Sequence, residues 1–149
     1  MSRHLLKVVW VLPNTCLGLS LVPLVLVTGG GVQIVDGTFE IYGGAVDWLL
    51  RWLVPLPTGA SAMTLGHSIL GRNQEVLALC RDHEQVHVRQ YERWGPFFLP
   101  AYFGASLWVW ARGRRPYRDN PFEQEAYALS DPWNRDESSR GPGIDPQPQ

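Results

Sequence analysis

Apolar positions dominate the beginning of the chain, and residues 8–28 contain no charged side chain. A stretch of roughly 20 apolar residues is long enough to cross a bilayer as a helix. Pro13, Asn14 and Pro23 interrupt the stretch, so a signal peptide and a helix buried in the core are open alternatives. We expect residues 1–29 to be a hydrophobic anchor, either a single-pass span or a re-entrant segment, and the protein to associate with a membrane.

Alternation of apolar and polar residues follows this segment and predicts a β-hairpin. Asp36-Gly37 is a two-residue turn signal. A turn there places four apolar side chains on one face of the hairpin: Val32, Ile34, Phe39 and Ile41. Gln33 and Glu40 pair on the opposite face, which we expect to meet water while the apolar face covers a core.

The remaining pattern predicts several helices and one more strand. Helices are expected over residues 45–56, 75–94, 96–111 and 120–131, and a strand over residues 62–70. The helix of residues 96–111 is apolar on all sides but short for a span, so it should be buried or interfacial. The last helix begins with Asn120 as its N-cap, Pro121 at its first position and Glu123 three residues after the cap.

Length and charge favour one folded domain that has no nucleic-acid partner. The chain has 149 residues, with 13 lysines and arginines against 14 acidic residues. Nucleic-acid binding usually requires a basic stripe, and the arginine run of residues 112–118 reads instead as a solvated loop. We expect residues 30–131 to form the folded domain. Residues 132–149 are polar and rich in proline and glycine, which predicts a disordered tail.

The sequence HEQVH, residues 83–87, lies inside the predicted helix of residues 75–94. His83 and His87 are four residues apart, so they project from the same helix face and can bind one zinc ion. Glu84 is rotated by about 100° from His83 around the helix axis, which places its carboxylate beside the metal. There it can take a proton from a zinc-activated water and pass it to a leaving amine.

The competing interpretation is that two histidines share a helix face by coincidence. They belong to the inward stripe of the helix, which also includes Val76, Leu79 and Cys80. Buried imidazoles need partners for their polar atoms, and a metal ion supplies one for both. We therefore predict a zinc site. His67, on the apolar face of the predicted strand, is expected to be an ordinary core residue.

A catalytic zinc site needs a third protein ligand and an open position. The residues after His87 lack a third histidine at the metzincin spacing, so the acidic residues of the last helix are the candidates. Glu123 and Glu125 both remain open, because Glu123 could instead bond back to the amide of Asn120 and cap the helix.

An HExxH helix followed by a helix that carries E-x-x-A resembles the gluzincin branch of zinc metallopeptidases. The likeness is to membrane-integrated peptidases of the heat-shock and prenyl-protein-processing type, and to the peptidase domains of antibiotic-sensing membrane receptors. It rests on residues 83–87 and 120–128 and implies that Glu123 is the third ligand. The chain departs from these families at Tyr127, where they carry an aspartate that orients a ligand histidine. The chain also resembles small bacterial proteins with HExxH and NPFE-x-EA segments, a likeness that implies no established activity.

Pattern and resemblance together predict a minimal zincin-like α+β fold. Its HExxH helix should lie beside a small antiparallel sheet, whose strand could bind an extended peptide by its edge. The predicted activity is hydrolysis of a peptide or protein substrate, with His83, His87 and Glu123 as Zn²⁺ ligands and Glu84 as general base. Tyr127 could orient a ligand or stabilise an oxyanion, but packing is favoured. The alternatives are an inactive zinc-binding pseudo-protease that serves as scaffold or sensor, and a structural membrane protein with a coincidental motif.

Overall fold

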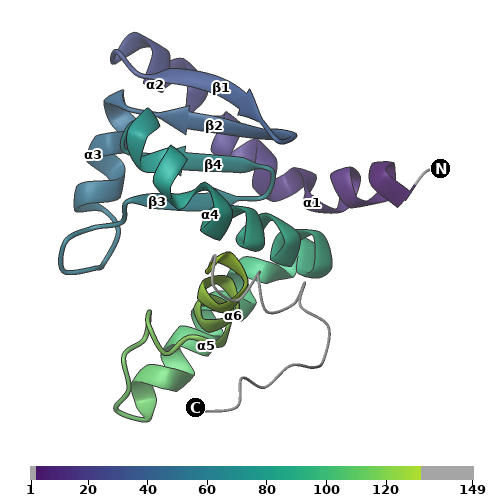
Figure 1. Ribbon diagram of the computed structural model, residues 1–149, viewed down its shortest axis with the longest axis vertical. Coiled ribbons are helices and arrows are strands. Elements are labelled where there is room, and N and C mark those ends of the chain that lie inside the picture. The colour runs from purple at the N-terminus through teal and green to yellow at the C-terminus, as the bar shows by residue number, and fades with distance from the viewer. Residues whose placement is uncertain (1–2, 132–149) are drawn as a thin grey trace, which may run out of the picture.

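A four-stranded sheet with helices on both faces forms the centre of the computed structural model, which describes residues 3–131 (Figure 1). The helices are α1 (Arg3–Leu19), α2 (Val22–Val27), α3 (Gly44–Trp52), α4 (Gln74–Trp94), α5 (Phe98–Ala111) and α6 (Pro121–Ser130). The strands are β1 (Gly31–Val35), β2 (Thr38–Tyr42), β3 (Ala62–Leu65) and β4 (Ser68–Gly71). The α+β class is confirmed. The predicted tail of residues 132–149 lies outside the described residues.

The strand order is β1-β2-β4-β3, with β2 and β4 parallel and the other neighbours antiparallel. The sheet is therefore mixed and not purely antiparallel as predicted. The parallel pair arises because α3 connects the two hairpins and returns the chain in the same direction. One consequence is that, among residues 3–131, β3 lies at the edge of the sheet and pairs with β4 alone.

The first hairpin has the predicted register, with Ile34 opposite Phe39. Asp36 and Gly37 have positive φ angles, 50° and 76°, as a type I′ turn requires. The prediction that the polar face of this hairpin meets water is wrong. Helix α4 covers that face, and Glu40 is completely buried because Arg81 donates to its carboxylate at 2.8 Å.

The prediction of a single strand over residues 62–70 is also wrong, because this segment forms two strands, β3 and β4, which pair as a second hairpin. Gly66 makes the turn with a φ of 66°, in close contact with the backbone of Thr15 on α1. His67 therefore lies in the turn, where its backbone N–H donates to Thr15 Oγ1 at 2.9 Å. Its imidazole is 3.4 Å from Glu92 and not on an apolar strand face.

Two apolar clusters fill the two faces of the sheet. On one face α2 and α3 pack against the central strands, in a cluster made by Val25, Ile41, Val46, Leu50 and Leu70. On the other face α4 packs through Leu77 and Val88 against Ile69 of β4. Alternation along β4 sends Ile69 and Leu70 to opposite faces, so a single short strand anchors helices on both sides.

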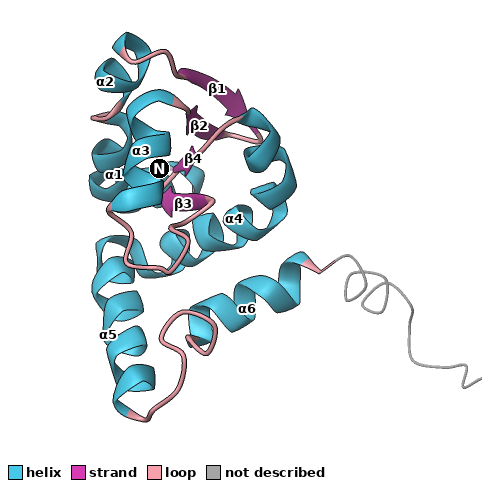
Figure 2. Cartoon of the chain, turned by 90° about the vertical axis from the view of Figure 1, so that its left-hand side faces the viewer, coloured by secondary structure: helices cyan, strands magenta, loops and turns pink. Residues whose placement is uncertain are grey.

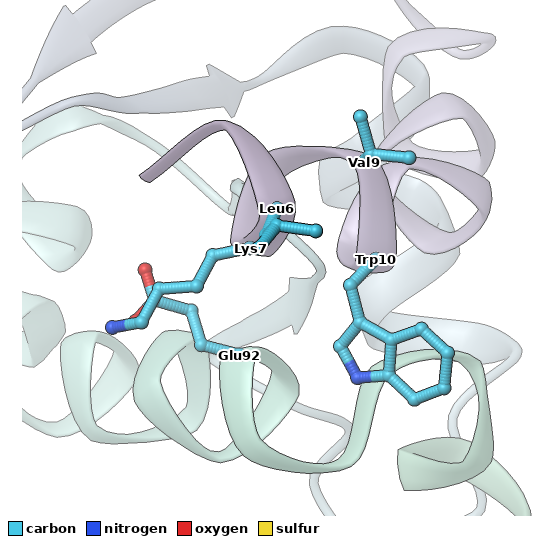
Figure 3. Close-up of a pocket in the computed structure, with 5 residues that line it drawn as sticks. All are labelled: Leu6, Lys7, Val9, Trp10 and Glu92. Atoms are coloured by element: carbon cyan, nitrogen blue, oxygen red, sulfur yellow. The ribbon is translucent and has the colours of Figure 1, made fainter. Parts of the chain in front are cut away.

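Helix α1 packs on the domain through Val11, which is buried in a cluster with Tyr91 and Phe98, and through polar contacts. The amide of Asn14 donates to the carbonyl of Gly95 at 3.1 Å, just after the end of α4. Lys7 donates to Glu92 of α4 at 2.6 Å, beside a surface depression of about 340 Å³ (Figure 3). Burial alone would raise the pKa of Glu92, but hydrogen bonds from Lys7 and His67 hold it below its ordinary value.

Within the described residues, Leu5–Val27 is the one helical stretch long and apolar enough to cross a membrane. The stretch bends after Leu19, where α1 ends, and resumes as α2. By length and composition it could be a membrane anchor or a signal sequence. The apolar helix α5 was predicted to be either buried or interfacial. It is not buried, since Phe103 and Leu107 are each 63% exposed.

Candidate metal centre

Helix α4 positions both histidines of the HEQVH sequence. Asn73 caps the start of the helix, because its side chain accepts a hydrogen bond from the N–H of Val76 at 2.8 Å. The stripe formed by Val86, His87, Gln90 and Tyr91 is buried, while His83 is half-buried. The predicted stripe does not extend to Leu79, which is 85% exposed.

Helix α6 brings Glu123 to the same place. Asn120 caps α6 by accepting from the N–H of Phe122 at 2.9 Å. Its amide nitrogen also donates to Tyr102 O and Ser106 Oγ, which ties the start of α6 to α5. The backbone N–H of Asn120 bonds to Tyr117 O, so Glu123 is not used for capping. The Glu123 carboxylate instead points toward the histidines and is almost fully buried.

Three side chains converge in a group that we call the His-His-Glu triad: His83, His87 and Glu123. The two Nε2 atoms are 3.2 Å apart. Glu123 Oε2 lies 3.2 Å from His83 Nε2, and Oε1 lies 3.4 Å from His87 Nε2. Two donors each about 2.05 Å from a tetrahedral zinc ion would be about 3.3 Å apart. One ligand atom from each member of the triad lies within 4.8 Å of the others, close to this spacing, so the triad could hold one such ion.

The charges of the triad also favour a bound cation. The short contact between two imidazole nitrogens cannot form between two lone pairs, so a proton or a metal ion must lie between them. Burial is the largest single effect and opposes the charged forms of Glu123 and His87, but the hydrogen bonds and charges around these two groups together outweigh it. They lower the pKa of Glu123 to about 2 and, with the nearby Glu84 carboxylate, raise the pKa of His87 to about 9.

Gln90 fixes the orientation of His87. Its amide nitrogen donates to Phe122 O at 3.0 Å and to Glu125 Oε2 at 2.7 Å. The amide oxygen must then accept from His87 Nδ1, 2.8 Å away, which leaves Nε2 as the atom directed at the triad. Sequence analysis missed this role, although Gln90 follows His87 by three residues on the same helix face.

Tyr102 of α5 supports the carboxylate. Its hydroxyl donates to Glu123 Oε1 at 2.6 Å, so the carboxylate is held from one side by a tyrosine and from the other by imidazoles. No sequence signal pointed to Tyr102, because its position depends on how α5 folds back along α4 and α6. Gln90 and Tyr102 together restrict the rotamers of two triad members.

Glu125, the other candidate for the third ligand, lies outside the triad. Its carboxylate accepts from Gln90 and is 3.3 Å from the guanidinium of Arg93. It therefore acts on His87 only through Gln90. His67 is also outside the triad.

The families that the chain resembles carry an aspartate where this chain has Tyr127, and this difference affects His83. His83 Nδ1 is the one buried side-chain polar atom in residues 3–131 for which no hydrogen-bond partner is found. The ring of Tyr127 packs against the His83 ring with centroids 4.5 Å apart, and its hydroxyl lies 3.5 Å from that of Tyr117. Tyr127 thus contacts His83 by packing and leaves Nδ1 without the acceptor that an aspartate would offer.

Glu84 faces the sheet. Its carboxylate is buried and accepts a hydrogen bond from Thr64 Oγ1 of β3 at 2.7 Å. Burial raises the pKa of Glu84 above its ordinary value, although His87 and Thr64 act in the opposite direction. Tyr91 holds the same strand by donating to Thr64 O at 3.1 Å. Thr64 is a contact of the HExxH glutamate that sequence analysis did not identify.

Comparison of the chain with protein-family models, with curated proteins and with solved structures finds no match. The description of the site therefore rests on its geometry alone. It is a buried His-His-Glu group, on a long helix that carries an HExxH-like sequence, and it could hold a metal ion.

The two acidic candidates on α6 should behave differently on substitution. Glu123→Gln is expected to weaken zinc binding by at least about tenfold, because it removes the negative charge from the triad. Glu125→Gln should weaken it only a few-fold, since it alters a residue that supports a ligand through Gln90. Zinc affinities measured by competition with a chromophoric chelator test this ranking. A larger loss in Glu125→Gln would exclude Glu123 as the third ligand.

Zinc affinity should also depend on pH. In the metal-free protein His87 has a pKa of about 9, so at neutral pH its imidazole holds a proton that zinc must displace. The apparent affinity is expected to rise about tenfold per pH unit between about pH 7 and pH 8, since one proton leaves for each ion bound. A competition titration corrected for protonation of the competing chelator measures the slope. A flat profile over this range would contradict the proton on His87.

Proposed function

We propose that this protein is a zinc-dependent peptidase, with His83, His87 and Glu123 as ligands and Glu84 as general base. The observation that carries the proposal is the convergence of the triad, in which each pair of side chains has donor atoms 3.2–3.4 Å apart. Two histidines and one glutamate are a ligand set of catalytic zinc sites, in which the fourth position is left for water or substrate. Zinc bound in this way would lower the pKa of water to near 7 and polarise a substrate carbonyl.

Glu84 is suited to move the proton. It follows His83 directly on α4 but is not a member of the triad, so its carboxylate is free of the ligand role. One of its oxygens is held by Thr64, which fixes the rotamer while the other oxygen can face the attacking water. Its raised pKa brings the carboxylate closer to the neutral range, where a base is effective. Glu84 would take the proton of the water and deliver it to the departing amine.

The edge strand β3 offers a place for the substrate backbone. It is adjacent to α4 and contributes the hydrogen bond to Glu84, so a peptide aligned with this edge would pass close to the general base. An extended peptide can add to a sheet edge through backbone hydrogen bonds. The side chain of His83, the most accessible member of the triad, marks the side from which a substrate would approach.

A second candidate function is zinc binding without catalysis, as a scaffold or sensor. It is favoured by the enclosure of the triad, since the side chains of His87 and Glu123 are only 9% and 3% exposed. A metal ion enclosed in this way would stabilise the packing of α6 on α4 and leave little room for a peptide.

A cleavage assay on a diverse peptide library separates the two functions. Zinc-loaded protein is expected to cleave a subset of the peptides, cleavage should stop after chelation, and it should return when zinc is added back. Protein that binds zinc with full occupancy but cleaves no member of the library supports the scaffold.

A further inference from the structure

Most of the large apolar side chains of helix α1 face away from the domain. The residues that face the domain are Val11, which is completely buried, Asn14 and Thr15, which are each only 5% exposed, and Gly18. Val9, Leu12 and Cys16, spaced three and four residues apart, form the opposite side and are exposed. In a water-soluble helix most large apolar side chains face the core, whereas most of those in α1 are exposed.

Helix α5 also exposes large apolar side chains on its outer side. Phe98 and Val109 face the domain, and so does Tyr102, which reaches the triad. Phe103, Leu107 and Trp110 recur at intervals of four and three residues on the opposite side, and all three are exposed. The outer side of α5 thus lies directly behind the residue that holds Glu123.

The exposed surfaces of the two helices meet through Trp10 and Phe97, both of which are exposed. The rings of Trp10 and Phe97, at the junction of α1 with the start of α5, have centroids 6.1 Å apart. Figure 2 shows α2, α1 and α5 following one another along the left-hand edge of the molecule, with α4 and α6 to their right. We call the surface formed by the outer residues of α1 and α5 the apolar face.

The far end of α5 carries aromatic and basic side chains together. Trp108 and Trp110 lie in its last turn, and the guanidinium of Arg112 stacks on the Trp108 ring at 4.0 Å. Three more exposed arginines follow, Arg114, Arg115 and Arg118, with Asp119 as the only acidic residue between positions 112 and 119. Tryptophan and arginine beside an apolar helix are typical of the boundary between lipid chains and anionic headgroups.

We infer that the apolar face is a membrane-binding surface, with the arginines of residues 112–118 in contact with anionic headgroups. The protein lies along the bilayer surface and does not cross it. Helix α1 is bonded on its inner side to Glu92 of α4 and to Gly95 just after it. Helix α4 has exposed charged residues, Glu75 and Arg89 among them, which need water. Both α1 and α5 therefore contact lipid by one side only. This inference is independent of the metal centre and of any peptidase activity.

Matched substitutions test the contribution of α5. Leu107→Glu places a charge on the apolar face, and Leu79→Glu places the same charge at an exposed position of α4. Binding of the full chain to vesicles of phosphatidylcholine and phosphatidylglycerol is measured by flotation. Leu107→Glu is expected to lower the partition coefficient by at least about tenfold relative to Leu79→Glu. Equal binding of the two variants, as expected if α1 alone held the protein by crossing the bilayer, overturns the inference.

A second pair of measurements tests whether the arginines contact anionic lipid and whether lipid or a second copy of the protein covers the apolar face. The triple variant Arg114→Gln, Arg115→Gln, Arg118→Gln should bind anionic vesicles less well by about fivefold per arginine, with unchanged binding to pure phosphatidylcholine. An equal loss of binding to anionic vesicles and to pure phosphatidylcholine vesicles would overturn the proposed contact with anionic lipid.

Sedimentation without vesicles is the last measurement. A dimer that Leu107→Glu converts to monomer would show that a second copy, and not lipid, covers the apolar face, whereas a monomer in both proteins supports lipid.

Discussion

Replacement of Glu84 by glutamine is expected to reduce peptide cleavage by about 10²- to 10⁴-fold while zinc remains bound. The amide has nearly the same shape as the carboxylate, and its oxygen can still accept from Thr64 Oγ1, so α4 should keep its contact with β3. It cannot take a proton from the attacking water, however. Because Glu84 lies outside the triad, the ligands themselves are unchanged.

The measurement is kcat/KM of the zinc-loaded proteins on a peptide that the parent protein cleaves, together with zinc content per chain. Glu75→Gln is the matched control, since it makes the same chemical change in the exposed first turn of α4. The control should retain both activity and zinc. Chelator-sensitive cleavage that persists at the parent rate in Glu84→Gln would exclude Glu84 as the base.

Replacement of His87 by alanine should have the largest effect on metal binding, with zinc affinity reduced by more than about 100-fold. Loss of a group that merely orients a ligand costs about 10- to 100-fold, and removal of the ligand should cost more. The change also leaves the oxygen of Gln90 without its donor. Purified parent protein should contain about one zinc per chain, and His87→Ala should contain almost none.

His67→Ala is the control for this substitution, because the imidazole of His67 contacts Glu92 and lies outside the triad. It should retain zinc like the parent protein. The thermal unfolding of His87→Ala with and without added zinc provides a second measure, since a ligand that binds only the folded state raises the midpoint temperature. Full zinc occupancy in His87→Ala would refute the site as we describe it.

Sequence patterns were most reliable where neighbours along the chain decide the structure. The Asp36-Gly37 turn is a local property, because few residues other than these adopt the positive φ angles of a type I′ turn, and the register of β1 and β2 follows from it. The cap at Asn120 is local in the same sense. Spacing along one helix also placed His83 and His87 on a common face.

Predictions failed where a distant segment supplies a missing partner. The polar face of the first hairpin was expected to meet water, but Arg81, 41 residues away, neutralises Glu40 and allows α4 to cover it. The strand predicted over residues 62–70 is broken at Gly66, where α1 approaches the backbone closely. Nothing in the local pattern distinguishes these outcomes from the ones predicted.

The sequence by itself determined the α+β class, the helix that carries HEQVH and the pairing of its two histidines on one face, since these depend on periods of two and 3.6 residues along a continuous chain. Only the tertiary structure brings Glu123, and not Glu125, into the group with the two histidines. This placement depends on how α6 is rotated against α4, and the rotation is set by contacts of Asn120 with α5 and of Gln90 with α6. The same packing placed Tyr102 on Glu123 and Thr64 on Glu84. Such contacts join residues about 20 positions apart, and their formation depends on the packing of whole elements, which no short sequence pattern encodes.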